Sequence, residues 1–499
     1  MRRDWFWNIL VIALVLSVAT GGYVYAQHGM PGKSAVLTKP QSKGAEIVSK
    51  FKYKPLEFTP PKAERRVLSN GMVLYLLEDH ELPLVNITAT VRAGSIYEPK
   101  EKAGLASLVG HVMRSGGTLT RSAEEINKEL EYIAASVETS IGRESGPAGL
   151  SVLTKDLDKA LEIFADVLMN PAFPEDKIKK RKDEVLESIR RENDNPGQIA
   201  FREFRKLLYE QHPYGRKVDG YADTIASITR DDMIAFHKKY FYPNNMIMGI
   251  SGDFSTQEML QKLEKVFMGW KKEEIDFPDV PKVENKMKRS VNYVHKDIEQ
   301  SNILLGHIGI ERTNPDYFPV RIMNFILGGG SFTARIQRKV RDEEGLAYSV
   351  YSAFHTPRDL GFFFVSCQTK AESTTRAISL ILEEVQRIKQ TPVDDDELKG
   401  AKDTFINQFI FLFTSSAAVV SHMVDIEYRG LPLDYLDTYV ENIQAVTKED
   451  VQRVAQKYLH PDKATLLVVG DEERFGQPLS GFGEVNTIEL KQVEATPQL

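Results

Sequence analysis

The segment 104–113 carries a side chain suited to metal chemistry, but it carries only one. It reads Gly-Leu-Ala-Ser-Leu-Val-Gly-His-Val-Met, with His111 as its single imidazole. A catalytic zinc needs three protein ligands and one open position. A lone His on a helix is more often a core or surface residue than a metal ligand. Taken by themselves, these residues predict a helix with one histidine and no second metal ligand.

No second arrangement of His and Cys in the sequence indicates a metal site. None of the ten histidines lies in an H-x-x-E-H or H-E-x-x-H pattern. His307 and Glu311 have helical spacing, but His307 lies in the strand-like run 303–310, which makes the spacing incidental. Cys367 is the only cysteine, so the chain has no internal disulfide and no cysteine-rich metal site.

The elements that would position these residues occur twice, because the body of the chain repeats itself. Thr229 is a natural N-cap of a helix that leads to an apolar strand, and Thr447 stands in the same succession 218 residues later. At a shift of 213 residues, Gly-Gly-Thr at 116–118 aligns with Gly-Gly-Ser at 329–331. Two matches in the same order indicate an internal duplication.

Each copy mixes strands with helices. The runs 73–77 and 85–91 have the composition of strands, whereas 156–169 and 175–193 have the periodicity of amphipathic helices. Strands followed by segregated helices are typical of α+β layers. We therefore predict an α+β fold of two homologous halves, each an antiparallel sheet covered by helices.

These features divide the chain into six segments. The linker is charged and contains Pro278 and Pro281. The predicted segments are a signal peptide or anchor at 1–26, a flexible lead-in at 27–64, an N-terminal domain at 65–271, the linker at 272–290, a C-terminal domain at 291–480 and a tail at 481–499.

The segment 104–113 resembles the zinc helix of the pitrilysin/insulinase-type metallopeptidases, the inverted zincins, whose signature is G-L-A-H-x-x-E-H-M. There, two His bind zinc and the Glu is the general base. Ser107 replaces the first His and Gly110 replaces the Glu, so only His111 remains. The resemblance covers about residues 65–475 and implies a clam-like pair of homologous halves, with the catalytic helix in the first.

The third zinc ligand of that family is also replaced. It is a Glu about 77 residues beyond the second His, in a helix reading V-L-x-E-I, and that position is Ser188 here. Glu187 is one residue away, rotated by about 100° around a helix. The resemblance therefore implies a degenerate site, at Ser107, Gly110, His111 and Ser188, that binds no zinc.

A second motif of the family is retained in the other half. Residues 340–350 resemble its L-R-E-x-x-G-L-A-Y motif, which places the family's Arg and Tyr on Arg341 and Tyr348. In the family these residues bind the substrate backbone and help to stabilise the tetrahedral intermediate. A guanidinium and a hydroxyl are suitable donors for an oxyanion. The bland alternative is that Arg341 pairs with a neighbouring acid and Tyr348 packs in a strand.

A glycine run precedes that motif. Gly328, Gly329 and Gly330 resemble, in shortened form, the glycine-rich substrate loop of the non-catalytic subunit in the family's processing peptidases. They also suit a helix C-cap followed by a turn.

This pattern of loss and retention resembles the zinc-less subunit of a two-chain peptidase. The resemblance implies a homologous partner that carries the zinc, a peptide or unfolded protein as substrate, and no cofactor on this chain. Two alternatives remain open. One is a non-enzymatic peptide-binding or scaffold subunit, and the other is a zinc endopeptidase with non-standard ligands that include His111 and Glu187.

Charge and the N-terminus bear on the compartment. A net charge of −6 without a long basic stretch argues against nucleic-acid binding.

Arg2 and Arg3 precede the apolar run 9–19, and Val24-Tyr25-Ala26 resembles a cleavage site. We favour a cleaved signal over an uncleaved membrane anchor. Both a cleaved signal and an uncleaved anchor predict an exported protein, either periplasmic or secreted. An uncleaved anchor would also hold the protein at the membrane.

Overall fold

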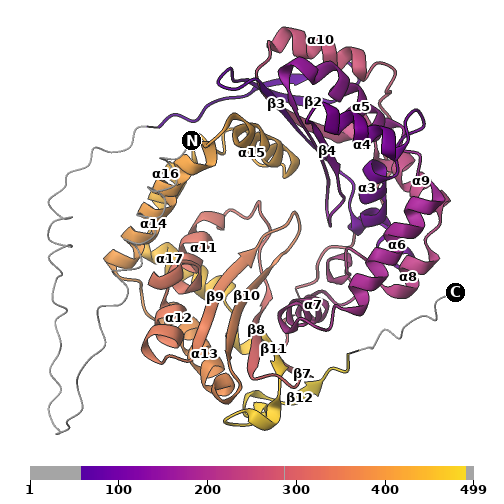
Figure 1. Ribbon diagram of the computed structural model, residues 1–499. Coiled ribbons are helices and arrows are strands. Elements are labelled where there is room, and N and C mark those ends of the chain that lie inside the picture. Colours follow the sequence, from indigo (N-terminus) through magenta and orange to yellow (C-terminus); the bar gives the residue numbers. More distant parts are fainter. Residues whose placement is uncertain (1–57, 286, 491–499) are drawn as a thin grey trace, which may run out of the picture. The chain divides into compact units, whose positions relative to one another are not determined.

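Two six-stranded sheets form the framework of the chain (Figure 1). The computed structural model describes residues 58–285 and 287–490. The predicted signal or anchor at 1–26 and most of the lead-in lie outside the described residues. Both sheets belong to one compact unit, Phe58–Leu499.

The first sheet has the strand order β1-β2-β6-β3-β5-β4. Its strands are β1 (Glu64–Val67), β2 (Val73–Glu78), β3 (Leu84–Val91), β4 (Ser136–Thr139), β5 (Gly146–Leu153) and β6 (Met246–Gly252). All neighbours are antiparallel except β2 and β6, which are parallel. A parallel pair needs a long crossover, and the chain between these two strands carries most helices of this half.

The second sheet repeats this plan in the order β12-β7-β11-β8-β10-β9. Its strands are β7 (Ser290–His295), β8 (Gln300–Ile308), β9 (Ala347–His355), β10 (Phe362–Lys370), β11 (Thr465–Gly470) and β12 (Val485–Thr487). Strand β7 runs parallel to both β11 and β12. Strand β12 lies in the segment predicted as a tail. The mostly antiparallel sheets confirm the predicted α+β fold, and the parallel pairs refine it.

Helices of the first half cover one face of the first sheet. They are α3 (Leu105–Ser115), α4 (Ala123–Tyr132), α5 (Leu157–Met169), α6 (Glu175–Arg190), α8 (Ala222–Ser227), α9 (Arg230–Tyr240) and α10 (Thr256–Val266). Leu108 and Val112 of α3 are fully buried with Phe164 of α5 in the core between helices and sheet. Burial of such side chains is the main stabilising contribution to this layer. Helices α6 and α9 both pack against α3.

The second half has its own helical layer. It contains α11 (Tyr317–Asn324), α12 (Arg335–Gln337), α13 (Thr374–Gln390), α14 (Asp395–Phe409), α16 (Tyr439–Ala445) and α17 (Lys448–Tyr458), with the π-helices η6 (Phe325–Gly329) and η8 (Arg338–Glu343). The two predicted N-caps are confirmed. The Asp232 backbone N–H donates to Thr229 Oγ1 at 3.2 Å, and Asp450 to Thr447 at 3.1 Å. Each half therefore starts the equivalent helix, α9 or α17, with the same capping box.

Each half also lends one helix to the sheet of the other half (Figure 1). Helix α7 (Pro196–Tyr209), from the first half, packs on β8 and β11 of the second sheet. Helix α15 (Ser416–Tyr428), from the second half, packs on β2, β3 and β6 of the first sheet. This exchange covers the second face of each sheet, and sequence periodicity did not predict it.

Both exchanged helices make close contacts. Phe201 of α7 meets Phe364 of β10 edge to face, with ring centroids 5.3 Å apart. A Cβ on Gly249 of β6 would lie 3.0 Å from Val420 Cβ of α15, so this glycine allows helix and sheet to approach closely. Glu427 of α15 accepts hydrogen bonds from Tyr75 and from Arg65, the latter with Nη2 at 2.7 Å. The two halves are thus joined by apolar and polar contacts.

Candidate degenerate zinc site and its surroundings

Helix α3, which carries three of the four degenerate positions, is fixed at its N-terminus by Glu98. The carboxylate accepts hydrogen bonds from the backbone N–H groups of Gly104 and Ala106, both at 2.8 Å. Gly104 has a φ of 99°, which a glycine adopts without strain. Burial raises the pKa of Glu98 to about 8, although both N–H groups favour the charged form.

Gly110 lies against the backbone of the segment that follows β4. A Cβ on Gly110 would lie 2.3 Å from the nitrogen of Ile141 and 2.5 Å from the carbonyl carbon of Ser140. Thr139 Oγ1 also donates to the Gly110 carbonyl oxygen at 2.6 Å. A side chain at 110 therefore requires the backbone to move. The general-base position of the family has no room for its glutamate here.

The two flanking positions of α3 face different neighbours. Ser107 Oγ donates to a carboxylate oxygen of Asp219 at 2.7 Å. His111 is half-buried, and its pKa is lowered first by burial and then by the nearby Arg181 guanidinium. Arg181 itself pairs with Glu184 at 3.2 Å, and Glu184 and Glu138 act on the His111 pKa in the opposite direction, so burial is the main cause of its lowering.

The fourth position, Ser188, lies exposed on α6 and lines a cavity together with Asp219. The family's ligand set thus reduces to one imidazole and two neutral hydroxyls, and such hydroxyls are not among zinc's usual protein ligands. Across 58–285 and 287–490, no cluster of three His, Cys, Asp or Glu side chains could hold a metal ion. The residues present do not fit zinc.

The other candidate ligands have ordinary structural surroundings. Glu187 is exposed and pairs with Arg190 at 3.1 Å and Arg191 at 3.3 Å. His307 is a buried core residue whose Nδ1 bonds to the Ile308 carbonyl oxygen at 2.8 Å. Its Nε2 accepts from the His460 backbone N–H at 3.1 Å, and burial lowers its pKa to about 4.

The cavity beside Ser188 measures about 590 Å³ and lies between α6, α7 and the loop 215–219. Its lining is rich in cationic side chains. These are Arg143, Arg181, Arg191, Arg202, Arg205, Arg216 and Lys217, against Glu184, Glu192 and Asp219. Nothing in the sequence spacing revealed this cluster, because its members come from four separate segments.

Arg341 and Tyr348 lie in the second half, on η8 and on the edge strand β9. Arg341 makes no ion pair with a described residue. Its guanidinium lies over the Phe332 ring at 4.8 Å, and its Nη1 donates to the Gln337 amide oxygen at 3.1 Å when that amide is oriented to accept. Tyr348 is 86% exposed and is the extra residue of a β-bulge in β9, where Ser349 pairs with Gln368 and Ala347 pairs with Thr369. Neither residue is among those that line the cavity at Ser188.

The glycine run forms the end of η6. A Cβ on Gly328 would lie 2.4 Å from Ser352 Oγ of β9, so the π-helix packs tightly on the strand. Gly329 and Gly330 line a separate cavity of about 500 Å³ between α11, α14 and β9. Gly330 is the C-cap of this π-helix, with its backbone N–H donating to the Phe325 carbonyl oxygen at 2.8 Å, and a 3-10 turn at Ser331–Thr333 follows, so the alternative of a cap and a turn is confirmed. The π-helix itself is a type of irregularity that is frequent at functional sites.

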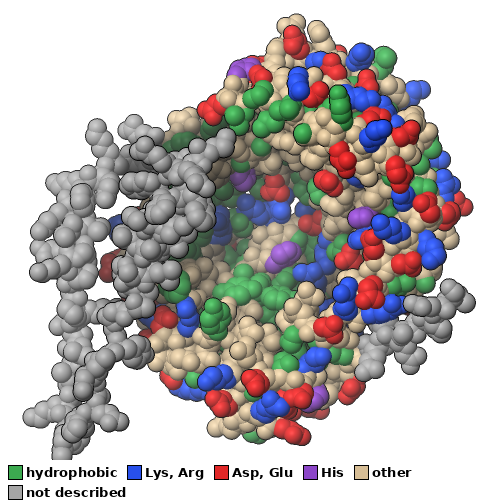
Figure 2. All heavy atoms as spheres, viewed as in Figure 1, with side chains coloured by type: hydrophobic (Ala, Val, Ile, Leu, Met, Phe, Trp, Pro, Cys, Tyr) green, Lys and Arg blue, Asp and Glu red, His purple; other side chains and the backbone are tan. Residues whose placement is uncertain are grey.

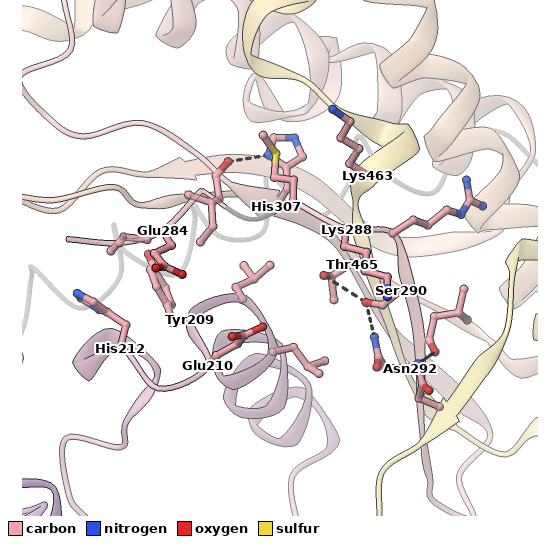
Figure 3. A pocket seen from close by; sticks show the side chains of 18 of the residues that line it. Tyr209, Glu210, His212, Glu284, Lys288, Ser290, Asn292, His307, Lys463 and Thr465 are labelled. Carbon is pink, nitrogen blue, oxygen red and sulfur yellow. Dashed lines mark hydrogen bonds between the residues drawn. The ribbon is translucent and has the colours of Figure 1, made fainter. Parts of the chain in front are cut away.

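Another cavity, with a volume of about 1060 Å³, was not expected from the sequence. It lies between α7, the linker, β7 and β12 (Figure 3). Asn292 Nδ2 donates to Ser290 Oγ at 3.0 Å, and Ser290 bonds weakly to Thr465 at 3.4 Å. The first contact lies within β7 and the second joins β7 to β11, and neither brings a nucleophile beside a base.

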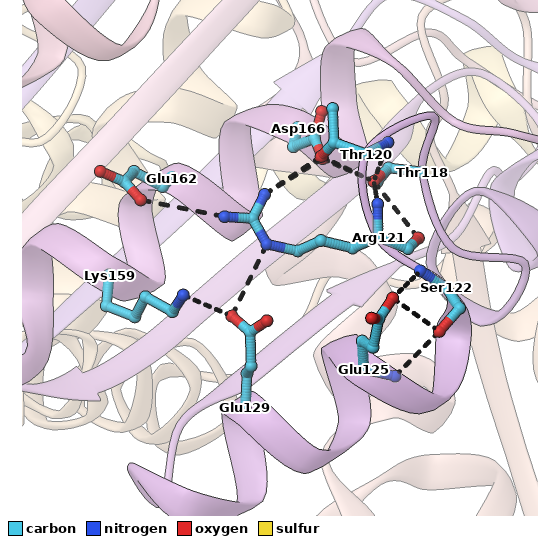
Figure 4. A network of polar contacts seen from close by, with 9 residues as sticks. All are labelled: Thr118, Thr120, Arg121, Ser122, Glu125, Glu129, Lys159, Glu162 and Asp166. Atoms are coloured by element: carbon cyan, nitrogen blue, oxygen red, sulfur yellow. Dashed lines mark hydrogen bonds and ion pairs between the residues drawn. The ribbon is translucent and has the colours of Figure 1, made fainter.

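The loop that follows α3 is held by a polar network around Asp166 (Figure 4). Thr118 and Thr120 both donate to Asp166 Oδ2 at 2.5 Å, and Arg121 lies 3.4 Å from the same oxygen. Burial would raise the pKa of Asp166, but these hydrogen bonds lower it below its usual range. This network joins the α3–α4 loop to α5 and serves to position the helices.

Comparisons with known proteins identify both halves. Residues 74–220 match the family model described as "Insulinase (Peptidase family M16)". Residues 227–405 match the model described as "Peptidase M16 inactive domain". The first match covers β2 to β5 with α3 to α7, and the second runs from α9 and β6 through the second half as far as α14.

The chain is also similar to curated relatives and to a solved structure. The chain is 26% identical over 407 residues to "Uncharacterized zinc protease YmxG" of Bacillus subtilis, covering 81% of this chain and 98% of that protein. It is 25% identical to "Non-peptidase homolog YmxG" of Helicobacter pylori, covering 80% and 91%. A crystal structure of the "peptidase M16 inactive domain" from Pseudomonas fluorescens superposes with a TM-score of 0.77 at 27% identity, covering 82% and 98%.

No single helix among the described residues is long and apolar enough to cross a membrane. One bent pair, Asp395–Phe413 with Ser416–Tyr428, meets the criteria jointly by length and composition, with an angle of 110° between its arms.

Proposed function

Because the chain belongs to the insulinase-type M16 peptidase family, we propose that it is the zinc-less subunit of a two-chain peptidase. A homologous partner with an intact H-x-x-E-H helix carries the metal in this proposal. This chain contributes Arg341 and Tyr348, which hold the substrate peptide, and it has no peptidase activity alone.

The observation that carries this proposal is the contact of Gly110 with the backbone of Ser140 and Ile141. A single lost ligand could be an isolated substitution. Here the site of the general base is filled by another part of the fold. The loss of metal chemistry is therefore built into the packing of α3.

The second half keeps groups suited to peptide binding. Tyr348 is exposed on an edge strand, and a β-bulge of this kind re-aims a side chain away from the regular pleat. An extended peptide that adds to the edge of β9 gains main-chain hydrogen bonds. Arg341 and Tyr348 then offer charged and neutral donors to a peptide carbonyl, a role in which such donors contribute most when charge develops on oxygen.

The proposed setting completes the assignment. An unfolded peptide or protein is the substrate, and the subunit is exported and acts in the periplasm or outside the cell. The segment 1–26 directs that export or anchors the protein to the membrane. The retained Arg–Tyr pair favours this function over a purely structural role, since a scaffold has no need of an exposed tyrosine at that position.

The test is reconstitution with a homologue from the same organism that has an intact H-x-x-E-H helix. Cleavage of unfolded casein is measured for each chain alone and for the complex. Arg341→Ala and Tyr348→Phe should each lower kcat/KM by about 10²-fold, the usual effect of losing one oxyanion donor. Arg338→Ala on the same π-helix and Tyr351→Phe on the same strand are matched controls and should leave cleavage unchanged.

Binding of the partner is measured in parallel by analytical ultracentrifugation. A complex that forms with every variant but loses activity only with changes at 341 and 348 supports the proposal. Unchanged cleavage by the Arg341→Ala, Tyr348→Phe double variant would sink it and would favour the scaffold alternative. Full activity of this chain without a partner would contradict it equally.

A further inference from the structure

The cavity at Ser188 contains more positive charge than its own residues neutralise. Seven Lys and Arg side chains line it against three Asp and Glu. Four of the cations have acidic partners. Arg181 pairs with Glu184 at 3.2 Å, Arg191 with Glu187 at 3.3 Å, Arg202 with Glu192 at 3.2 Å, and Lys217 also with Glu192.

The other three cations are Arg143, Arg205 and Arg216, and no described residue forms an ion pair with any of them. Arg143 Nη1 donates to the backbone carbonyl oxygens of Arg216 at 2.9 Å and Pro213 at 3.2 Å. Arg216 Nη1 donates to the Glu98 carbonyl oxygen at 3.3 Å. Such contacts fix the direction of a guanidinium and leave other N–H donors for a ligand.

Arg205 lies on α7 and makes no hydrogen bond to a described residue. Its guanidinium lies over the Phe362 ring at 5.9 Å. Burial and the neighbouring charge of Arg205 lower the pKa of Arg143 to about 10, which still leaves it charged at neutral pH. The two arginines thus repel each other in a half-buried setting, a cost that a bound anion would remove.

The acids on the cavity wall are not available to neutralise this charge. Glu192 already forms ion pairs with Arg202 and Lys217, and Glu184 forms one with Arg181. Asp219 accepts from Ser107. Glu144, adjacent to Arg143 in the chain, accepts from the Tyr214 hydroxyl and from the Arg358 backbone N–H. Its charge favours the Arg143 cation, but burial and Arg205 still lower the Arg143 pKa.

From these contacts we infer that the cavity is a binding site for a peptide carboxylate, held by Arg143, Arg205 and Arg216. Guanidinium groups bind carboxylates in bidentate geometry, which makes arginine the suitable residue for this ligand. The volume of about 590 Å³ and the apolar side chains Val185, Ile189 and Phe201 leave room for the adjoining residue of the peptide.

The proposed carboxylate site borders the degenerate zinc site. Ser188 and the Ser107 partner Asp219 both border this cavity. The arginine-rich cavity therefore adjoins the degenerate site at Ser188, whereas Ser107, Gly110 and His111 are not among its lining residues. The carboxylate is either the C-terminus of a peptide or an Asp or Glu side chain within it. The inference adds a ligand class to the proposed subunit, and its test requires neither the partner nor catalysis.

The experiment measures binding of fluorescent peptides to the full chain alone by polarisation. The probes are an N-acetylated oligoalanine with a free C-terminus, its C-terminal amide, and the amide with one internal aspartate. We expect at least one carboxylate peptide to bind at least tenfold more tightly than the neutral amide. The free-acid and aspartate probes distinguish the two sources of carboxylate.

Arg205→Met tests the site with little risk to folding, because Arg205 makes no hydrogen bond and methionine can still cover Phe362. It should weaken carboxylate binding at least tenfold, whereas Arg205→Lys should restore part of it. Lys206→Met, an exposed neighbour on the same helix that does not line the cavity, is the matched control and should change affinity less than twofold.

Thermal unfolding confirms that each variant is folded. Equal binding of amide and carboxylate peptides, unchanged binding by Arg205→Met, or no binding at millimolar peptide would each overturn the inference. None of these results depends on whether the reconstituted complex cleaves casein, so failure here is distinguishable from failure of the proposed function.

Discussion

The packing of Gly110 predicts that one added methyl group destabilises the protein. In an exposed helix, replacing Gly by Ala stabilises by about 1 kcal/mol, because alanine has the higher helix propensity. At 110 the new Cβ would lie 2.3 Å from the Ile141 nitrogen, which is backbone and cannot rotate away. Overpacking of this kind costs about 1–3 kcal/mol. Because the gain in helix propensity offsets part of this cost, we expect Gly110→Ala to lower the free energy of unfolding by about 1 kcal/mol.

Gly400→Ala is the matched control. Gly400 is exposed within α14, and a Cβ there would meet no atom within 4 Å. The same chemical change should therefore stabilise the protein by about 0.5–1 kcal/mol. The assay is urea unfolding followed by circular dichroism, with the two variants compared on one denaturant scale.

A local readout accompanies the stability measurement. The Ser140 backbone N–H donates to the Pro147 carbonyl oxygen at 3.0 Å, a contact that must yield if the 139–141 segment moves. Hydrogen exchange at Ser140 should become faster in Gly110→Ala and remain unchanged in Gly400→Ala. If Gly110→Ala proves as stable as Gly400→Ala, the packing argument for the lost base position is refuted.

Three further predictions concern metal, pH and the thiol. The triple variant Ser107→His, Gly110→Glu, Ser188→Glu should bind less than one tenth equivalent of zinc by elemental analysis, since a side chain at 110 displaces α3 from the 140–141 backbone and with it the ligand positions 107 and 111 on the same helix; a full equivalent would contradict this. Burial raises the Glu98 pKa from 4.5 to about 8, so the folded state retains a proton that the unfolded chain releases. Stability should then fall between these pH values by up to about 1.4 kcal/mol per unit, and Glu98→Gln should flatten the profile; identical profiles would refute the assignment. Burial raises the pKa of the Cys367 thiol to about 12, so iodoacetamide at pH 7.5 should label it only in the unfolded chain.

The duplicated scaffold could be predicted because local residue types determine it. The capping boxes at Thr229 and Thr447 depend on a side chain and a backbone group three residues apart, which a sequence displays directly. The strand-like run 85–91 corresponds to β3, whose residues alternate between buried and half-buried. The amphipathic run 156–169 corresponds to α5, whose apolar stripe is buried.

The exchange of α7 and α15 could not be predicted, because periodicity shows that a helix has an apolar face but not which sheet covers it. The role of Gly110 was hidden for a similar reason. The sequence shows that the glutamate is missing, whereas the approach of Ile141 depends on how β4 meets α3. The arginine cavity likewise unites Arg143, Arg205 and Arg216 from separate segments.

The parallel pairs β2–β6 and β7–β11 belong to the same class of long-range fact. Their partners are separated by a whole layer of helices, so nothing within either strand indicates its neighbour. The sequence could place Tyr348 on a strand and Arg341 in the segment before that strand. The exposure of Tyr348 could not be predicted, because it follows from the bulge in β9.

The most direct test of the central claim is the zinc content of the purified chain and of its complex with the zinc-bearing homologue. Both are dialysed against micromolar zinc, desalted and measured by mass spectrometry of the metal. The account predicts less than one tenth equivalent on this chain alone and one equivalent per heterodimer, bound by the partner. One tightly bound equivalent on this chain alone would contradict it.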